Sequence, residues 1–145
     1  MVARQARTQQ RACALELVNG HPMSQETTPS ERRYIFVAQV TMPASHHAIF
    51  EELYENEHVP NLMKVPGVKS CSRFKMEWAI CEMAEYLTIY EVDHPDVPKS
   101  EAWREAANKG GWGEKVRPFY TLRQHGMYSS TGPTVLSEST RPTTT

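Results

Sequence analysis

The sequence predicts an α+β domain whose elements follow the order β-α-β-β-α-β, with a four-stranded antiparallel sheet and both helices on one face of it. Three observations support this prediction. Four segments are rich in β-branched and aromatic residues, two segments place apolar residues at helical spacing, and Gly or Pro separates several of them. This element order is that of the ferredoxin-like, or split βαβ, arrangement.

The first two elements follow from residue type and spacing. Residues 33–42, RYIFVAQVTM, predict a central strand, since both of its faces carry apolar side chains. Residues 46–59 predict a helix, because Ile49, Phe50, Leu53 and Tyr54 recur at intervals of three and four. Ser45 is expected to cap the start of this helix, and Pro60 is expected to end it.

The second half of the domain is read in the same way. Residues 68–78 alternate in polarity and predict a strand, and residues 85–92 predict another. Ser100 is expected to cap a helix over 101–109 that ends at two glycines. A short helical turn over 112–118 and a last strand over 119–129 complete the order.

One domain over residues 33–129 accounts for most of the 145 residues. Residues 1–32 are expected to be disordered or an extension. They are read either as a stretch upstream of a start at Met23 or as a basic, acid-poor presequence. Residues 130–145, rich in Ser, Thr and Pro, are expected to form a disordered tail.

Composition argues against several function classes. With 16 basic and 17 acidic residues, net charge −1, the chain has no basic stripe for nucleic acid, and no apolar run is long enough for a membrane span. The three cysteines, Cys13, Cys71 and Cys81, lack metal-ligand spacing and suggest reduced thiols and a cytoplasmic location. Neither a metal nor another cofactor is expected, because no histidine pair or Gly-rich phosphate loop has the required spacing.

The second face of the predicted sheet also needs a cover. The first strand is apolar on both sides, and no further element of the chain is left to cover the face without helices. A homodimer packed sheet against sheet is therefore expected.

Two segments resemble a known group of proteins. FEELYENEHVPNLMKVPGV is similar to the first-helix signature of EthD-like proteins in the dimeric α+β barrel superfamily, and YEVDHPDVPKSEAWREAANKGGWGEKVRP is similar to their strand-three to helix-two signature. The matching residues in the first segment are Phe50, Tyr54, Glu57, His58, Pro60, Pro66 and Gly67. Those in the second are Tyr90, Glu91, Pro95, Trp103, Trp112, Arg117 and Pro118. The likeness covers about residues 34–128, and Leu53 departs from it where relatives often carry Trp.

The resemblance implies a small-molecule site around His58, since some relatives use a histidine at this place as acid or base. The catalytic candidates are His58, Tyr90 as a donor to a substrate oxygen, and Glu57 as a carboxylate that could orient the imidazole. The other expected substrate-binding residues are Tyr34, Phe36, Phe50, Tyr54, Arg73, Trp103 and Trp112. Arg73 and Arg117 could hold a carboxylate or phenolate, and Arg117 could equally cap a helix end or bridge the dimer.

His58 is expected to face a partly enclosed apolar cleft and to titrate near neutral pH, with a helix-end histidine without chemistry as the alternative. The leading hypothesis is a cofactor-independent lyase, isomerase or cyclase in which His58 moves a proton on a small carbonyl or phenolic compound. The alternatives are a cofactor-independent monooxygenase of the same fold and a non-catalytic EthD-like binding or accessory protein.

Overall fold

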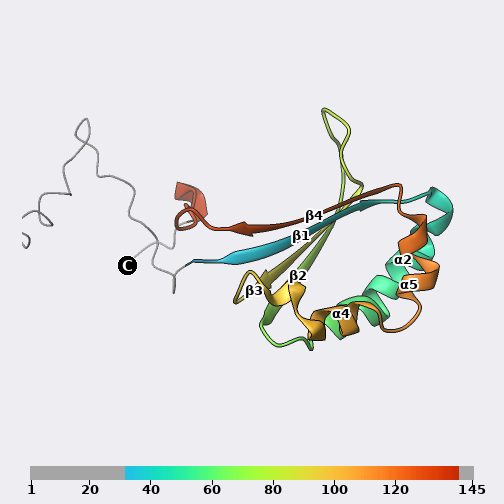
Figure 1. Cartoon of the computed structure of the whole chain (residues 1–145). Helices are drawn as coiled ribbons and strands as arrows, with labels where there is room; N and C mark the ends of the chain where they lie inside the picture. Colours follow the sequence, from blue (N-terminus) through green and yellow to red (C-terminus); the bar gives the residue numbers. More distant parts are fainter. Residues whose placement is uncertain (1–31, 141–145) are drawn as a thin grey trace, which may run out of the picture. The chain divides into compact units, whose positions relative to one another are not determined.

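A four-stranded antiparallel sheet with helices on one face forms the unit Arg33–Ser130 of the computed structural model, which describes residues 32–140 (Figure 1). The expectations for residues 1–31 and 141–145 lie outside the described residues. Residues 131–140 are described by themselves. They contain the short turn η5 (Glu138–Thr140), in which the Thr140 hydroxyl donates to the Ser137 carbonyl at 3.0 Å.

The sheet has the strand order β2-β3-β1-β4 with every neighbouring pair antiparallel, so the ferredoxin-like α+β prediction is confirmed. The strands are β1 (Tyr34–Thr41), β2 (Val68–Lys75), β3 (Tyr86–Val92) and β4 (Leu122–Ser129). β1 is central, as its apolar residues on both faces predicted. The last strand begins three residues later than expected, because residues 117–119 form the 3-10 turn η4 (Arg117–Phe119).

The register of the sheet decides which side chains face the helices. Residues directly opposite each other in antiparallel strands share a face. Val40 pairs with Tyr86 on one side and with Arg123 on the other, and Ala38 pairs with His125. These positions lie on the helix face, and the intervening positions of each strand lie on the opposite, open face.

The first helical segment runs on further than the sequence predicted. It passes from η1 (Ala44–His46) and α2 (His47–Leu53) through the π-helical turn η2 (Tyr54–His58) into α3 (Val59–Leu62). Pro60 therefore does not end it. The Val59 N–H donates to the Tyr54 carbonyl, five residues back, and Pro60 occupies the first turn of α3, where a missing donor is tolerated.

The start of this segment also differs from the expectation. The Ser45 side chain makes no capping hydrogen bond to the helix; its hydroxyl lies 3.0 Å from Nδ1 of His46. The chain enters α2 through the 3-10 turn η1, so the N-cap position falls on His46.

The second helical segment is capped as the sequence predicted. It follows η3 (Val97–Lys99) and consists of α4 (Glu101–Ala107) and α5 (Trp112–Lys115). The Ser100 hydroxyl accepts from the Trp103 backbone N–H at 3.2 Å, which satisfies one of the free donors at the start of α4. Gly110 has φ +69°, a left-handed conformation that other residues adopt only with strain.

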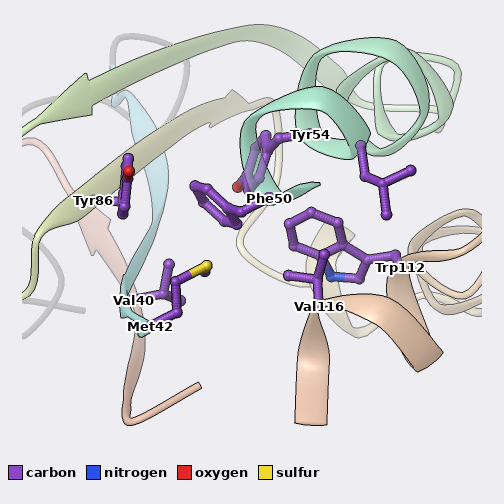
Figure 2. Packing of buried hydrophobic residues seen from close by; sticks show 8 residues of the cluster. Val40, Met42, Phe50, Tyr54, Tyr86, Trp112 and Val116 are labelled. Atoms are coloured by element: carbon purple, nitrogen blue, oxygen red, sulfur yellow. The ribbon is translucent and has the colours of Figure 1, made fainter. Parts of the chain in front are cut away.

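Two clusters of buried side chains join the helices to the sheet. Figure 2 shows the first of them, in which Phe50 and Tyr54 of the first helical segment meet Trp112, with Val40 and Met42 from the end of β1 on the other side of Phe50. Its members are Val40, Met42, Phe50, Leu53, Tyr54, Tyr86, Trp112 and Val116. The second contains Leu62, Val65, Tyr90, Val92, Trp103 and Ala106.

The open face of the sheet carries no helix of this unit, and it presents apolar side chains among polar ones such as Gln39, Glu91 and Gln124 (Figure 1). The register places there the side chains of Ile35, Val37, Phe74, Leu87, Ile89 and Tyr128. Phe74 is 52% exposed and Tyr128 is 56% exposed. This open face is the surface that the sequence predicted would need a partner.

Candidate functional site

A cavity of about 630 Å³ lies between the helix face of the sheet and the two helical segments. Its size falls in the range of small-molecule sites. β1, β3 and β4 contribute to its walls, together with η2, α3, α4 and α5, whereas β2 contributes no residue. Its aromatic lining residues are Phe36, Tyr54, Tyr90, Trp103, Trp112 and Tyr120, with His58 and His125 beside them.

His58 is part of the cavity wall and is almost enclosed, with 8% of its surface exposed. Its ring stacks on Trp112 with centroids 4.0 Å apart and planes 12° apart, and it meets the Tyr54 ring edge-on at 5.2 Å. Nδ1 of His58 is fully buried and has no hydrogen-bond partner. A buried polar atom without a partner costs about 1–3 kcal/mol, so this atom calls for an explanation.

The expectation that His58 titrates near neutral pH is wrong. Burial in the first place, and then the positive charge of Arg117 and the nearby His125, together lower the pKa of the imidazole to about 3. The expected opposing effect of a carboxylate is missing, because neither Glu55 nor Glu57 contributes to the pKa of His58. The ring is therefore neutral at physiological pH.

Glu57 makes a different contact from the one predicted. Its carboxylate accepts a hydrogen bond from the Gly111 backbone N–H at 3.0 Å, at the start of α5. It approaches Gly110 so closely that a Cβ there would collide with it. Glu57 thus ties the π-helical turn to the loop before Trp112, and it positions the indole on which His58 stacks.

The cavity also contains a pair of tyrosines that remain protonated. The Tyr90 hydroxyl donates to the Tyr54 hydroxyl at 3.4 Å, and burial raises the pKa of both phenols. Burial likewise raises the pKa of Tyr120 in the same cavity. These hydroxyls are hydrogen-bond donors and not bases at physiological pH.

Four cationic side chains line the cavity, and among residues 32–140 its lining contains no aspartate or glutamate. Two of the four are paired with carboxylates outside the lining: Lys99 with Asp96 at 3.6 Å and Arg104 with Glu101 at 2.8 Å. The other two, Arg117 and Arg123, have no carboxylate partner in the described part of the chain.

Some predicted substrate-binding residues do not reach this cavity. Phe36, Tyr54, Trp103 and Trp112 line it, whereas Tyr34, Phe50 and Arg73 do not. Phe50 is 1% exposed and belongs to the first core cluster. Arg73 belongs to β2, which contributes no residue to the cavity, and its guanidinium covers the Tyr54 ring at 4.8 Å from the ring centroid.

Several lining residues were not predicted as site residues, among them Tyr120, Arg123 and His125. The sequence did contain a signal for Arg123, His125 and Met127, since they alternate along the last strand and so share one face. That they share the face of Val40 and Ala38 depends on the register against β1.

The cysteines within the described residues are free thiols. Cys71 is half-buried beside Tyr90, and burial raises the pKa of its thiol, so it is a poor nucleophile at neutral pH. None of the helices in residues 32–140 has the length and apolarity needed to cross a bilayer.

Comparison with solved structures places the fold among proteins of the predicted group. An EthD family protein from Bacillus halodurans matches with a TM-score of 0.51 and 14% identity over 66% of this chain and 96% of its own. A DABB family protein with a ferredoxin-like fold from Mesorhizobium loti gives 0.51 and 10% identity over 70% and 99%. A dimeric ferredoxin-like protein of unknown function from Thermobifida fusca gives 0.50 and 10% identity over 74% and 95%.

At these identities the likeness shows a shared fold and not a shared activity. No family model matches the chain. No curated protein matches it either. The resemblance read from the two sequence segments is confirmed at the level of the fold, and the chemistry has to be argued from the cavity itself.

Proposed function

We propose that the protein is a cofactor-independent enzyme that binds a small apolar carbonyl or phenolic compound in the cavity and moves a proton on it through His58. The observation that carries this proposal is the His58 ring itself. It is neutral, almost fully buried, stacked on Trp112 and part of an aromatic cavity, and its Nδ1 has no partner in the protein. A histidine that only ended a helix would face solvent.

The proposed chemistry starts from the neutral ring. His58 accepts a proton from a carbon next to a carbonyl or from a phenolic hydroxyl, and the substrate becomes an enolate or phenolate. The imidazolium then lies beside an anion, which offsets part of the cost of charging a buried ring. Return of the proton to another carbon of the enolate completes an isomerisation. In a cyclisation the enolate carbon instead attacks a second carbonyl of the same molecule, and the alkoxide that forms takes the proton from His58. In an elimination the enolate expels a leaving group from the β carbon, and that group departs with the proton.

The remaining cavity groups support this role. We assign the donor to a substrate oxygen to the Tyr54–Tyr90 pair, because both hydroxyls line the cavity and stay protonated. Such a donor stabilises negative charge as it develops on that oxygen. Trp112 and Glu57 are positioning residues in this proposal: Trp112 fixes the plane of the His58 ring, and Glu57 holds the loop that carries Trp112.

We also propose a homodimer that packs through the open face. That face presents Phe74 and Tyr128 to solvent in the single chain. One solved structure of similar fold is a dimeric protein, which supports a paired sheet here. Burial of the apolar side chains of an open sheet face against a second copy is the usual solution when a domain has no second layer on that side.

The test is hydrogen exchange at the carbon next to the carbonyl of simple aryl ketones such as 1-indanone, followed by NMR in D₂O. The wild-type chain should accelerate exchange over buffer, and His58→Gln should lose about 10²-fold of that rate. His94→Gln is the matched control, because the His94 side chain is 64% exposed and outside the cavity.

Three outcomes separate the candidate functions. Equal exchange by wild type and His58→Gln would contradict the proposed role of His58. Oxygen uptake with a phenolic substrate, without isomerised product, would point to the monooxygenase alternative. Ligand binding with neither exchange nor oxygen uptake would favour a non-catalytic binding protein.

A further inference from the structure

We infer that the molecule bound in this cavity carries an anionic group, a carboxylate on an aromatic or similarly apolar body, and that Arg117 and Arg123 bind this group. The inference rests on the proposed function in that it names the substrate class of the same site. Its first support is the imbalance of charge in the lining: four cations and, among the described residues, no carboxylate.

The four cations differ in whether a carboxylate of the protein already neutralises them. Lys99 and Arg104 already form ion pairs with Asp96 and Glu101. An anion bound in the cavity would therefore gain little electrostatic attraction from these two cations. Arg117 and Arg123 lack such a match within residues 32–140. Like charges at one site repel each other, and an anion between them removes that repulsion.

The two unmatched guanidinium groups come from separate elements and reach the same cavity. Arg117 in η4 is held in place, since it donates to the Asn108 side-chain oxygen at 2.8 Å and to the Ala107 carbonyl at 3.3 Å. These bonds fix the group without neutralising it. Arg123 on β4 pairs with Val40 in the sheet register, so its side chain starts from the helix face.

His125 is a cavity residue on which both arginines act electrostatically. Nε of Arg123 is 3.5 Å from Nε2 of His125, and the His125 ring packs edge-on against Phe36 at 5.3 Å. Partial burial lowers the pKa of His125 first, and the charges of Arg123 and Arg117 lower it further. Arg123 thus lies beside His125 and Phe36, and Arg117 lines the same cavity, so a bound carboxylate would have guanidinium donors and apolar rings within one cavity.

The same charges act on His58, which links anion binding to the proposed chemistry. The groups that face His58 are the Tyr54 ring on its own helical segment, Trp112 on α5, Arg117 on η4 and His125 on β4. Neither an aspartate nor a glutamate contributes to the lowered pKa of His58. A carboxylate bound to Arg117 would offset the positive charge that now disfavours the imidazolium, so the bound substrate would make His58 a stronger base.

The test compares two probes of equal shape, 1-naphthoate and 1-naphthamide, by isothermal titration calorimetry with the full chain at pH 7 and low salt. Naphthoate should bind about tenfold more tightly than the amide, because charge-assisted hydrogen bonds are the stronger ones. Arg123→Gln should reduce naphthoate affinity about tenfold and leave naphthamide affinity unchanged. Arg104→Gln is the matched control: it removes a lining charge that Glu101 already neutralises, so naphthoate affinity should hold.

Arg117→Gln should act like Arg123→Gln, but it also removes the bonds to Asn108 and Ala107. If its melting temperature falls, Arg123→Gln alone decides the question. Equal affinity for both probes, no binding of either, or undiminished naphthoate affinity in Arg123→Gln would overturn the inference. Such results would leave hydrogen exchange on neutral ketones by His58 standing, whereas selective naphthoate binding without any exchange would overturn the proposed enzyme and not the anion site.

Discussion

The buried neutral state of His58 predicts a measurable loss of stability in mild acid. In the folded chain the pKa of His58 is lowered from 6.5 to about 3, whereas in the unfolded chain it has its ordinary value. Below pH 6.5 the unfolded chain therefore binds a proton at this residue that the folded chain does not bind. The free energy of unfolding must then fall as pH falls from 6.5 toward 3 and must be unaffected by this residue above pH 7.

The magnitude follows from the size of the shift. Each pH unit between the two pKa values contributes about 1.4 kcal/mol, so moving from pH 7 to pH 5 should remove about 2 kcal/mol through His58 alone. A change of about 2 kcal/mol is a large fraction of the free energy of unfolding of a small domain, which is about 5–15 kcal/mol. His125 acts in the same direction, but its side chain is more exposed, and it is present in every variant compared.

The assay is urea unfolding followed by tryptophan fluorescence at pH 7 and pH 5, at one protein concentration so that association does not differ. The stability difference between the two pH values should be about 2 kcal/mol smaller in His58→Gln than in wild type, and unchanged in His94→Gln. Equal pH dependence of His58→Gln and wild type would refute the view that the ring is buried in its neutral form.

Two further predictions concern the frame of the site. Gly110→Ala should lower the free energy of unfolding by about 1–2 kcal/mol, because a left-handed conformation is strained for alanine and the new Cβ meets the Glu57 carboxylate. Gly132→Ala, whose new Cβ would contact nothing, is the control, and an unchanged urea midpoint for Gly110→Ala would contradict the account. Phe74→Glu should convert a dimer into a monomer in light scattering without loss of helical circular dichroism, since Phe74 is 52% exposed in the single chain. A wild-type chain that is already monomeric at micromolar concentration would rule out the open-face dimer.

Much of the fold could be predicted because it depends on local patterns. The residue pattern predicts the first strand over residues 33–42, and the strand lies at Tyr34–Thr41. Ser100 caps α4, as its place before the helical stretch predicts. The error at Pro60 has a specific cause. The rule that proline ends a helix assumes bonds four residues apart, whereas the Val59 N–H bonds five residues back, and residue spacing alone does not reveal this.

The site was harder to predict because its properties come from contacts between distant residues. His58 was found from its place on the helix stripe, but its pKa depends on enclosure beside Trp112 and on Arg117, both more than fifty residues away in the sequence. The same holds for Glu57, whose partner Gly111 is 54 residues away. Arg123 and His125 enter the cavity only because β4 pairs with β1 in one particular register.

The central claim is that His58 is a neutral ring that faces a ligand cavity, and ¹⁵N NMR of the imidazole tests it most directly. The ring nitrogens should show a neutral imidazole from pH 7 down to pH 5 in the free protein, and they should shift when a cavity ligand such as 1-indanone is added, while those of His94 should not. A His58 ring that titrates between pH 6 and 7, or that does not respond to any ligand that binds, would contradict the account.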